Sequence, residues 1–229
     1  MDKGNSRLQN GKLLLYAVTD RAWVGRQTLL EQIEDALRGG VTILQLREKE
    51  LDEAGFVEEA IQVRELCHRY NVPLIINDNV EVALKSGADG VHVGIEDQPV
   101  EEIRKRVGKE FIIGATAKTV DQAQAAEKAG ADYLGVGAVF PSPTKKNAIR
   151  ITKKQLHEIC TSVSIPAVAI GGISLDNMNE ISGGGMQGVA VVSAIFAAGD
   201  IKMAAEKLKR QVGLIVENKR NTEENGERI

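Results

Sequence analysis

Short, β-branched apolar runs alternate along this chain with segments whose apolar residues recur at helical spacing. Such runs are typical of buried strands, and the helical spacing is typical of amphipathic helices. We predict strands at Leu13–Val18, Thr42–Leu46, Leu74–Ile76, Gly90–Val93, Phe111–Ala115, Tyr133–Val136, Ala167–Ile170 and Gly188–Val192. We predict helices at Leu29–Leu37, Glu53–Arg69, Val80–Lys85, Val100–Val107, Val120–Lys128, Lys153–Ile159, Leu175–Ile181 and Ile201–Val212. This alternation predicts a parallel sheet with helices outside it.

A glycine motif repeats where predicted helices end and strands begin. It reads Gly39-Gly40-Val41, Gly87-Ala88-Asp89, Gly130-Ala131-Asp132 and Gly184-Gly185-Met186. Glycine suits the left-handed position that ends a helix. Successive motifs lie 47, 43 and 55 residues apart, counted between Gly40, Gly87, Gly130 and Gly185, and each interval holds two strand–helix units. Four such repeats predict an α/β fold of one domain, a single (β/α)8 TIM barrel.

An open, doubly wound sheet is the alternative fold. It is less favoured because no nucleotide-type glycine turn follows the first predicted strand. We place the catalytic barrel domain at residues 1–213. The remaining residues, 214–229, are rich in charge, and we expect a frayed helix followed by a disordered tail.

Composition narrows the classes of function. The 229 residues are 43% hydrophobic and 27% charged, which is ordinary globular usage. Lys and Arg number 29 against 32 Asp and Glu, and the net charge of −3 disfavours a nucleic-acid binder. The chain has neither a membrane-length apolar stretch nor a signal-type N-terminus, so we expect no membrane partner and a cytoplasmic location. Cys67 and Cys160 lack metal-ligand spacing and are interpreted as buried thiols.

Polar residues gather where the predicted strands end. The carboxyl ends of the strands carry the active sites of TIM barrels, so these residues share one rim. Arg47, Lys49 and Lys145 supply positive charge there, and Asp78 and Asp97 supply carboxylates. Cations beside two carboxylates indicate a phosphate group together with Mg²⁺, which carboxylates and substrate phosphates commonly hold between them.

Glycines and a serine follow the last two predicted strands. Gly171-Gly172 comes after the seventh strand, and Val192-Ser193 ends the eighth. The loops after these two strands are the usual monophosphate site of the fold, built from backbone N–H groups. A diphosphate and a monophosphate in one barrel mouth imply two phosphorylated small-molecule substrates, or one long one.

Each cluster taken alone has a plainer interpretation. The charged turn around Glu48 could be a solvated surface, and Asp78 and Asp97 could cap the helices that follow them. Gly171-Gly172 could be a simple tight turn, and His92 could be a core residue or one that only supports a site residue. The placement of every cluster on the same predicted rim favours a site.

These residues, in this order, resemble the thiamine-phosphate synthase family over the barrel from Leu15 to about Phe196. The resemblance rests on the motifs Tyr16-Ala-Val-Thr-Asp20, Gln45-Leu-Arg-Glu-Lys49, Ile76-Asn-Asp78, Gly90-Val-His-Val-Gly94 with Asp97, Gly130-Ala-Asp-Tyr-Leu-Gly-Val-Gly137, Thr144-Lys-Lys146, Ile170-Gly-Gly-Ile173 and Val192-Ser193. Each motif is weak alone, whereas the ordered set is highly specific.

The resemblance implies an activity and a role for each matching residue. The family joins hydroxymethylpyrimidine diphosphate to hydroxyethylthiazole phosphate, giving thiamine monophosphate and diphosphate. The pyrimidine diphosphate would be held by Gln45, Arg47, Lys49, Asn77 and Lys145, and Mg²⁺ by Asp78 and Asp97. The thiazole phosphate would be surrounded by Ser142, Thr144, Gly172, Val192 and Ser193. Thr116 stands where the family usually has a serine that hydrogen-bonds the leaving group, so the implied catalytic residues are Arg47, Lys49, Thr116 and Lys145.

The chain departs from the family pattern at several positions. Ile95 replaces a common Gln, Ser142 a common Thr, and the segment Thr116-Ala-Lys-Thr119 a common Ser-Ala-His-Thr. Ser142 and Thr116 keep their hydroxyl groups, whereas Ile95 loses an amide that could hold the pyrimidine.

Three rival functions are less favoured by the sequence. Thiazole tautomerases share the barrel, but they lack much of the diphosphate-binding set and place a histidine where this chain has Lys118. A Schiff-base aldolase would need a desolvated lysine, and both rim lysines stand among charges. A non-catalytic phosphate-binding barrel would not need both acids and all three cations. The sequence leaves the oligomeric state open, a homo-oligomer included.

Overall fold

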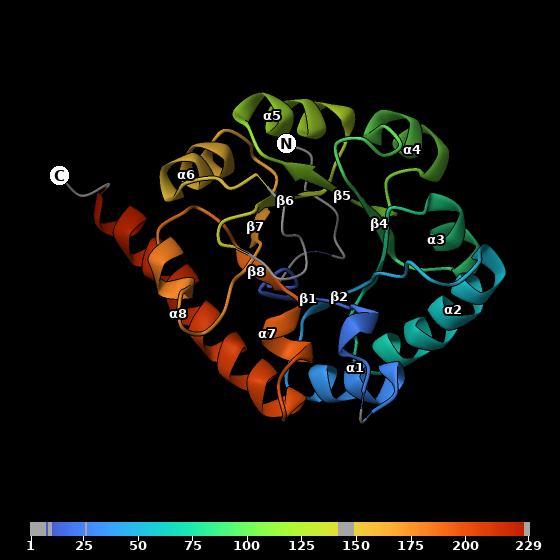
Figure 1. Cartoon of the computed structure of the whole chain (residues 1–229). Helices are drawn as coiled ribbons and strands as arrows, with labels where there is room; N and C mark the ends of the chain where they lie inside the picture. Colours follow the sequence, from blue (N-terminus) through green and yellow to red (C-terminus); the bar gives the residue numbers. More distant parts are fainter. Residues whose placement is uncertain (1–7, 9–10, 26, 142–148, 227–229) are drawn as a thin grey trace.

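Eight parallel strands form a closed ring in a computed structural model of the chain, and helices surround this ring (Figure 1). The structure describes residue 8 and residues 11–25, 27–141 and 149–226. Each strand pairs with the next in sequence, and β8 pairs with β1 to close the barrel. The predicted (β/α)8 TIM barrel is confirmed.

The strands and helices follow the predicted order. The strands are β1 Leu15–Val18, β2 Ile43–Leu46, β3 Leu74–Asn77, β4 Gly90–Val93, β5 Ile112–Ala117, β6 Tyr133–Gly137, β7 Ala167–Ile170 and β8 Gly188–Val191. The helices are α1 Leu29–Arg38, α2 Glu53–Arg69, α3 Val80–Ser86, α4 Val100–Val107, α5 Val120–Ala129, α6 Lys153–Thr161, α7 Ser193–Phe196 and α8 Ile201–Gly226. Two 3-10 helices, η2 Arg21–Trp23 and η3 Met178–Ile181, complete the set described.

The repeated glycines end helices as expected. Gly87 and Gly130 cap α3 and α5 with φ angles of 68° and 97°, in the left-handed region. Gly40 and Gly185 also have positive φ angles, of 93° and 83°. The repeat therefore marks the sharp turns that return the chain from each of four helical segments to the next strand.

The helix predicted at Leu175–Ile181 is wrong. The segment holds only the 3-10 helix η3, and Asn177 shows why. Its side chain accepts a hydrogen bond from the backbone N–H of Ser174 (2.9 Å) and donates one to the carbonyl of Gly172 (2.8 Å). An Asn side chain that bonds to nearby backbone in this way competes with the helical hydrogen bonds.

The last helix passes the domain boundary expected at residue 213. Helix α8 continues to Gly226, and Ile215 is buried. Ala205, Leu208 and Val212 are buried on the same helix, so Ile215 extends their spacing of three and four residues by one step. The apolar face therefore ends later than the sequence suggested. Among the described residues, no helix is long and apolar enough to cross a membrane.

The barrel interior is filled by side chains. Its buried residues are Leu13, Tyr16, Val18, Ile43, Ile75, Ile112, Tyr133, Val168 and Ala190. A larger apolar cluster lies between the strands and the helices and includes Cys67 and Cys160, both buried and unbonded to each other. A packed interior is typical of this fold, and it leaves the rim at the carboxyl ends of the strands as the place for a ligand.

Candidate active site

Arg47 and Lys49 follow β2, and each contacts an acid from a neighbouring loop. The guanidinium of Arg47 lies 3.2 Å from Asp20, which follows β1. The ammonium of Lys49 lies 3.3 Å from Asp78, which follows β3. Thr19 helps to fix this arrangement, because its hydroxyl accepts a hydrogen bond of 2.9 Å from the backbone N–H of Arg47. Both predicted cations therefore face the rim from an anchored loop.

Glu48 anchors that loop from within. One oxygen of its buried carboxylate accepts hydrogen bonds from the backbone N–H groups of Lys49 (2.6 Å), Glu50 and Leu51 (3.3 Å). Its other oxygen pairs with the guanidinium of Arg21. Burial alone raises the pKa of Glu48, but these hydrogen bonds outweigh it and hold the pKa below its ordinary value. Glu48 therefore stays ionised and fixes the turn that presents its two basic neighbours.

Asp78 and Asp97 face each other across the ends of β3 and β4. Burial raises the pKa of Asp78, and the neighbouring carboxylate of Asp97 raises it further, while Lys49 acts in the opposite direction. Asp97 accepts a hydrogen bond of 2.6 Å from the backbone N–H of Gly94, which holds its carboxylate at the rim. Two carboxylates of like charge placed so close together favour a bound cation.

Neither acid caps the helix that follows it. The N-cap of α3 is Asn79, whose side chain accepts from the N–H of Val82, and the N-cap of α4 is Pro99. Asp78 instead occupies a left-handed backbone conformation with a φ angle of 61°. The plainer interpretation of these acids as helix caps is thereby excluded.

The acids fit Mg²⁺ in one specific way. The part of the chain that the structure describes contains no cluster of three His, Cys, Asp or Glu residues able to hold a metal alone. Mg²⁺ commonly takes one or two carboxylates and completes its shell with water and substrate phosphates. Asp78 and Asp97 therefore fit a metal shared with a phosphorylated substrate.

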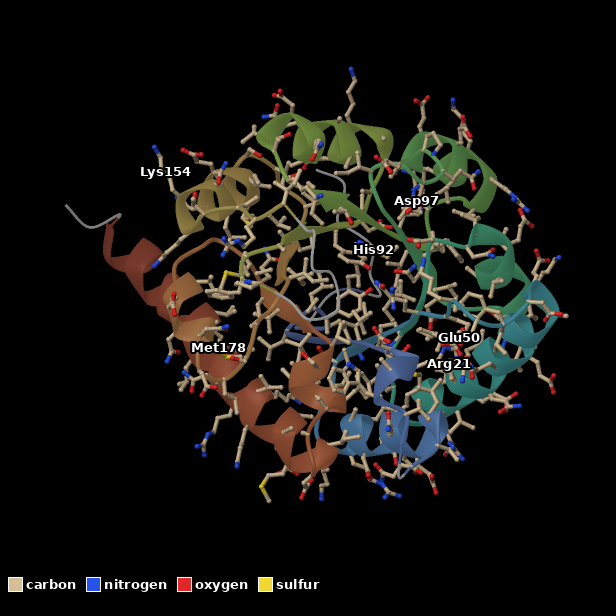
Figure 2. The ribbon with its side chains drawn as sticks, in the orientation of Figure 1. Arg21, Glu50, His92, Asp97, Lys154 and Met178 are labelled. Carbon is tan, nitrogen blue, oxygen red and sulfur yellow. The ribbon has the colours of Figure 1, made fainter. Side chains whose placement is uncertain are left out.

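Gln45 and Thr116 are joined through the barrel interior. Hydrogen bonds link the Gln45 amide to Tyr16 (2.8 Å), Tyr16 to Tyr133 (2.8 Å), Tyr133 to His92 (3.0 Å) and His92 to Thr116 (3.1 Å). Figure 2 shows His92 within the ring of strands and Asp97 at its edge, near α4. We call these five residues the interior hydrogen-bond chain. It links two predicted substrate-binding residues that stand on β2 and β5.

The loops after β7 and β8 present backbone groups to the rim rather than charged side chains. Gly171 and Gly172 have φ angles of 103° and 65°, and a Cβ atom on Gly172 would lie 2.1 Å from the carbonyl oxygen of Pro141. Only glycine fits there, because of both the conformation and the close approach. Val192 follows β8 directly and is the N-cap of α7, and Ser193 is the first residue of that helix.

The predicted site residues thus fall into two groups. The charged half consists of Arg47, Lys49, Asp78 and Asp97, and the backbone half of Gly171, Gly172, Val192 and Ser193. Asn77 ends β3 beside the charged half.

Two positions that depart from the family pattern also follow strands at the rim. Ile95 is 49% exposed on the loop after β4, and Lys118 follows β5 directly. Ser142, Thr144 and Lys145 lie outside the described residues, so their roles stay predictions.

Several residues of the site were missed by sequence reasoning. Asp20 stands only within a motif of the family resemblance, and neither Asp20 nor Arg21 is assigned a role from the sequence, although both follow β1 as the other rim residues follow their strands. Tyr16 and Tyr133 were treated as strand residues, and their alternation along β1 and β6 was the available signal that they point into the barrel. His92 is expected to be either a core residue or one that supports a site residue, and its hydrogen bond to Thr116 (3.1 Å) fits the second of these.

A closed (β/α)8 barrel with paired acids, rim cations and a glycine cradle at one end defines a phosphate-handling enzyme of the TIM-barrel class. The comparisons with known proteins narrow this class. The family model described as thiamine monophosphate synthase matches residues 15–195. The chain belongs to this family, whose curated members are transferases.

Individual relatives agree with the family match. The thiamine-phosphate synthase of Ruminiclostridium cellulolyticum is 47% identical over 85% of this chain and 92% of its own length. That of Methanobrevibacter smithii is 44% identical over 89% and 97%. A solved thiamine phosphate pyrophosphorylase from Pyrococcus furiosus superposes with a TM-score of 0.83 at 39% identity, covering 90% of this chain and 98% of its own. The family predicted from the sequence motifs is confirmed.

Proposed function

We propose that this chain joins hydroxymethylpyrimidine diphosphate to hydroxyethylthiazole phosphate, forming thiamine monophosphate and releasing diphosphate. The observation that carries this proposal is the division of the rim. Four charged groups follow β2, β3 and β4 on one part of the rim, and a turn of glycine backbone follows β7 on another part of the same ring. A substrate with two phosphates fits the first half, and a monophosphate fits the second.

The reaction proceeds by breaking the bond between the pyrimidine methylene carbon and the diphosphate oxygen. The electron pair leaves with diphosphate, and the methylene carbon becomes a cation that the aminopyrimidine ring stabilises. The thiazole nitrogen then donates its electron pair to that carbon. No protein nucleophile is needed, so the residues act by binding charge and aligning the two substrates.

The charged half stabilises the departing group. Arg47 presents a planar fork that suits two phosphate oxygens, and Lys49 acts as a point charge. Lys145, outside the described residues, is assigned the same role as Lys49. Charge on the diphosphate grows as the bond breaks, so these cations bind the transition state more tightly than the substrate.

Asp78 and Asp97 would hold Mg²⁺ against the diphosphate. The bound metal supplies positive charge to the leaving oxygens. The ammonium of Lys49 lies 3.3 Å from Asp78 and so contacts one of the two acids that would hold the metal. Gln45, Asn77 and Thr116 would contact the pyrimidine diphosphate from the ends of β2, β3 and β5.

The backbone half orders the second substrate. Gly172, Val192 and Ser193 would surround the thiazole phosphate, together with Ser142 and Thr144. The hydrogen bond between Asn177 and the carbonyl of Gly172 (2.8 Å) fixes the glycine turn before any ligand arrives. Such preorganisation reduces the entropy that binding must otherwise cost. A cytoplasmic location and a homo-oligomer remain predictions from the sequence and the family.

The test is product formation. The purified chain is mixed with both substrates and Mg²⁺, and thiamine monophosphate and diphosphate are quantified over time. We expect equimolar products, no reaction in excess chelator, and recovery on adding Mg²⁺. Absence of thiamine monophosphate from a folded, metal-supplied protein would overturn the proposal. Isomerisation of a carboxylated thiazole phosphate by the same sample would instead favour a tautomerase.

A further inference from the structure

The interior hydrogen-bond chain crosses the barrel with a residue from each of five strands. Gln45 lies on β2, Tyr16 on β1, Tyr133 on β6, His92 on β4 and Thr116 on β5. The two phenol side chains are buried, with residue exposures of 1% and 0%. Water is therefore not in reach of the middle of the chain, and each hydroxyl must place its single proton on a protein atom.

Counting donors gives the hydrogen-bond chain a direction. The amide nitrogen of Gln45 can only donate, so the Tyr16 oxygen accepts from it. The one proton of Tyr16 then points to the oxygen of Tyr133, 2.8 Å away. The proton of Tyr133 in turn points to Nδ1 of His92. An Nδ1 atom that accepts leaves the imidazole proton on Nε2, which donates to the hydroxyl oxygen of Thr116.

The direction matters at the last hydroxyl. Because the Thr116 oxygen already accepts from His92, its own proton is not used in the interior and can be donated to a ligand. Thr116 is half-buried and is the last residue but one of β5, at the carboxyl end of the strand, which belongs to the rim. A hydroxyl that turned its proton to His92 would present only lone pairs to a ligand, and lone pairs repel phosphate oxygens.

The barrel is shaped around this chain. Gly114 on β5 lies between its neighbours in register, His92 and Tyr133. A Cβ atom at Gly114 would lie 2.5 Å from Nδ1 of His92 and 2.3 Å from the Tyr133 hydroxyl oxygen. Burial also raises the pKa of both Tyr16 and Tyr133, so both phenols keep their protons. The absence of a side chain at Gly114 and the protonated state of both phenols therefore support the interior hydrogen-bond chain.

We propose that Tyr16, Tyr133 and His92 are positioning residues. The two tyrosines hold His92 in its Nε2–H tautomer, and His92 thereby directs the Thr116 hydroxyl proton toward the departing diphosphate. No proton moves along the chain, because its role is to fix orientation before substrate binds. The inference rests on the proposed function only for the identity of the anion that Thr116 meets. The tautomer itself is a property of the free protein.

The first experiment measures the tautomer directly. Nitrogen NMR of the full-length protein with ¹⁵N-labelled histidine distinguishes the protonated from the bare ring nitrogen. Only three histidines occur, so His68→Gln and His157→Gln assign the His92 signals by elimination. We expect Nε2–H in the wild type and a mixture of tautomers in Tyr133→Phe. An Nδ1–H form in the wild type would overturn the proposal, without any need for turnover.

The second experiment compares two amides at position 92. The nitrogen of Gln in His92→Gln can occupy the place of Nε2 and still donate to Thr116, whereas Asn in His92→Asn is too short to do so. We expect kcat to fall less than about 3-fold in His92→Gln and about 10-fold or more in His92→Asn, with KM nearly unchanged. Equal losses in both variants would show that His92 serves only packing.

A double-mutant cycle separates orientation from general damage. Tyr133→Phe should lower kcat several-fold in the wild type and have no further effect in Thr116→Val, where no hydroxyl remains to be oriented. Tyr70→Phe, which removes a hydroxyl outside the barrel, is the matched control and should leave kcat unchanged. Additive effects of Tyr133→Phe and Thr116→Val would overturn the proposal. Lack of product from the wild type would instead overturn the proposed function and leave the tautomer result standing.

Discussion

The two halves of the rim bind anions by different means. The charged half depends on side chains that reach across between loops, as Arg47 does to Asp20 and Lys49 to Asp78. The backbone half depends on a conformation, because Gly172 is in the left-handed region and a Cβ atom there would lie only 2.1 Å from the carbonyl oxygen of Pro141. The charged half can be altered one side chain at a time. The backbone half loses its anion binding as a whole when its backbone geometry changes.

The largest expected effect lies in the paired acids. Asp78→Asn and Asp97→Asn should each reduce activity on the order of 100-fold at ordinary Mg²⁺ concentrations, because each removes a ligand from a metal with only two protein carboxylates. Part of the activity should return at high Mg²⁺. Steady-state rates over a Mg²⁺ titration provide the measurement, and wild-type rates at low Mg²⁺ would contradict the assignment.

The melting temperature of Asp78→Asn tests whether this acid serves the site or the stability of the fold. The folded-state pKa of Asp78 is raised, so the charged form destabilises the fold at every pH above the ordinary pKa of the group. Removing the charge should therefore leave the metal-free melting temperature equal to or above that of the wild type at pH 7, and the difference should vanish as pH falls below about 4. A large drop in melting temperature would mean that the acid serves the fold.

Arg47→Ala should lower kcat by about 10- to 50-fold, less than the loss of either acid, since its charge matters most as diphosphate departs but the metal and the neighbouring cations remain. Lys145→Ala is expected to act in the same direction. Single-turnover experiments isolate the chemical step from substrate binding. Normal single-turnover rates with a raised KM alone would show that Arg47 holds the substrate without assisting its cleavage.

Gly172→Ala tests the backbone half. The added Cβ meets the carbonyl oxygen of Pro141, so the turn must move and its backbone donors with it. We expect KM for the thiazole phosphate to rise about 10-fold or more, from the loss of hydrogen bonds to a charged group, with little change in KM for the pyrimidine diphosphate. Gly183→Ala is the matched control, because it also has a positive φ angle but nothing within 4 Å of its Cβ. Equal effects of the two variants would show that backbone strain alone is responsible.

The smallest effect is expected outside both halves. Deleting residues 217–229 should leave kcat unchanged and shift the melting temperature by no more than about 1–2 °C, because the buried face of α8 reaches Ile215 and is retained. Circular dichroism melting curves of both forms provide the measurement. A loss of many degrees would place part of the barrel's stability in that segment.

The contrast between the halves also explains what the sequence could predict. The barrel follows from eight strand–helix alternations and glycine turns, which are local patterns. Arg47, Lys49, Asp78 and Asp97 could be found because charged residues directly after buried strands are conspicuous. Their partners could not, since the pairing of Arg47 with Asp20 depends on which strands are neighbours and on how the loops fold back.

The interior hydrogen-bond chain was beyond sequence reasoning for a related reason. Tyr16 and Tyr133 are 117 positions apart, and only closure of the barrel brings their hydroxyls to 2.8 Å. The helix predicted over the η3 segment was wrong for a different reason. Its apolar spacing is compatible with a helix, but the side chain of Asn177 forms hydrogen bonds with nearby backbone that compete with helical ones. Local pattern therefore predicted the scaffold, and tertiary contacts determined how the site is held.

In the proposed reaction, each half of the rim takes one phosphorylated substrate. A crystal structure with Mn²⁺ in place of Mg²⁺, diphosphate and hydroxyethylthiazole phosphate tests it most directly, because Mn²⁺ is located by its anomalous scattering. We expect Mn²⁺ between Asp78 and Asp97, diphosphate against Arg47 and Lys49, and the thiazole phosphate on the backbone of Gly172 and Ser193. Both anions in the same half, or Mn²⁺ bound away from the two acids, would contradict it.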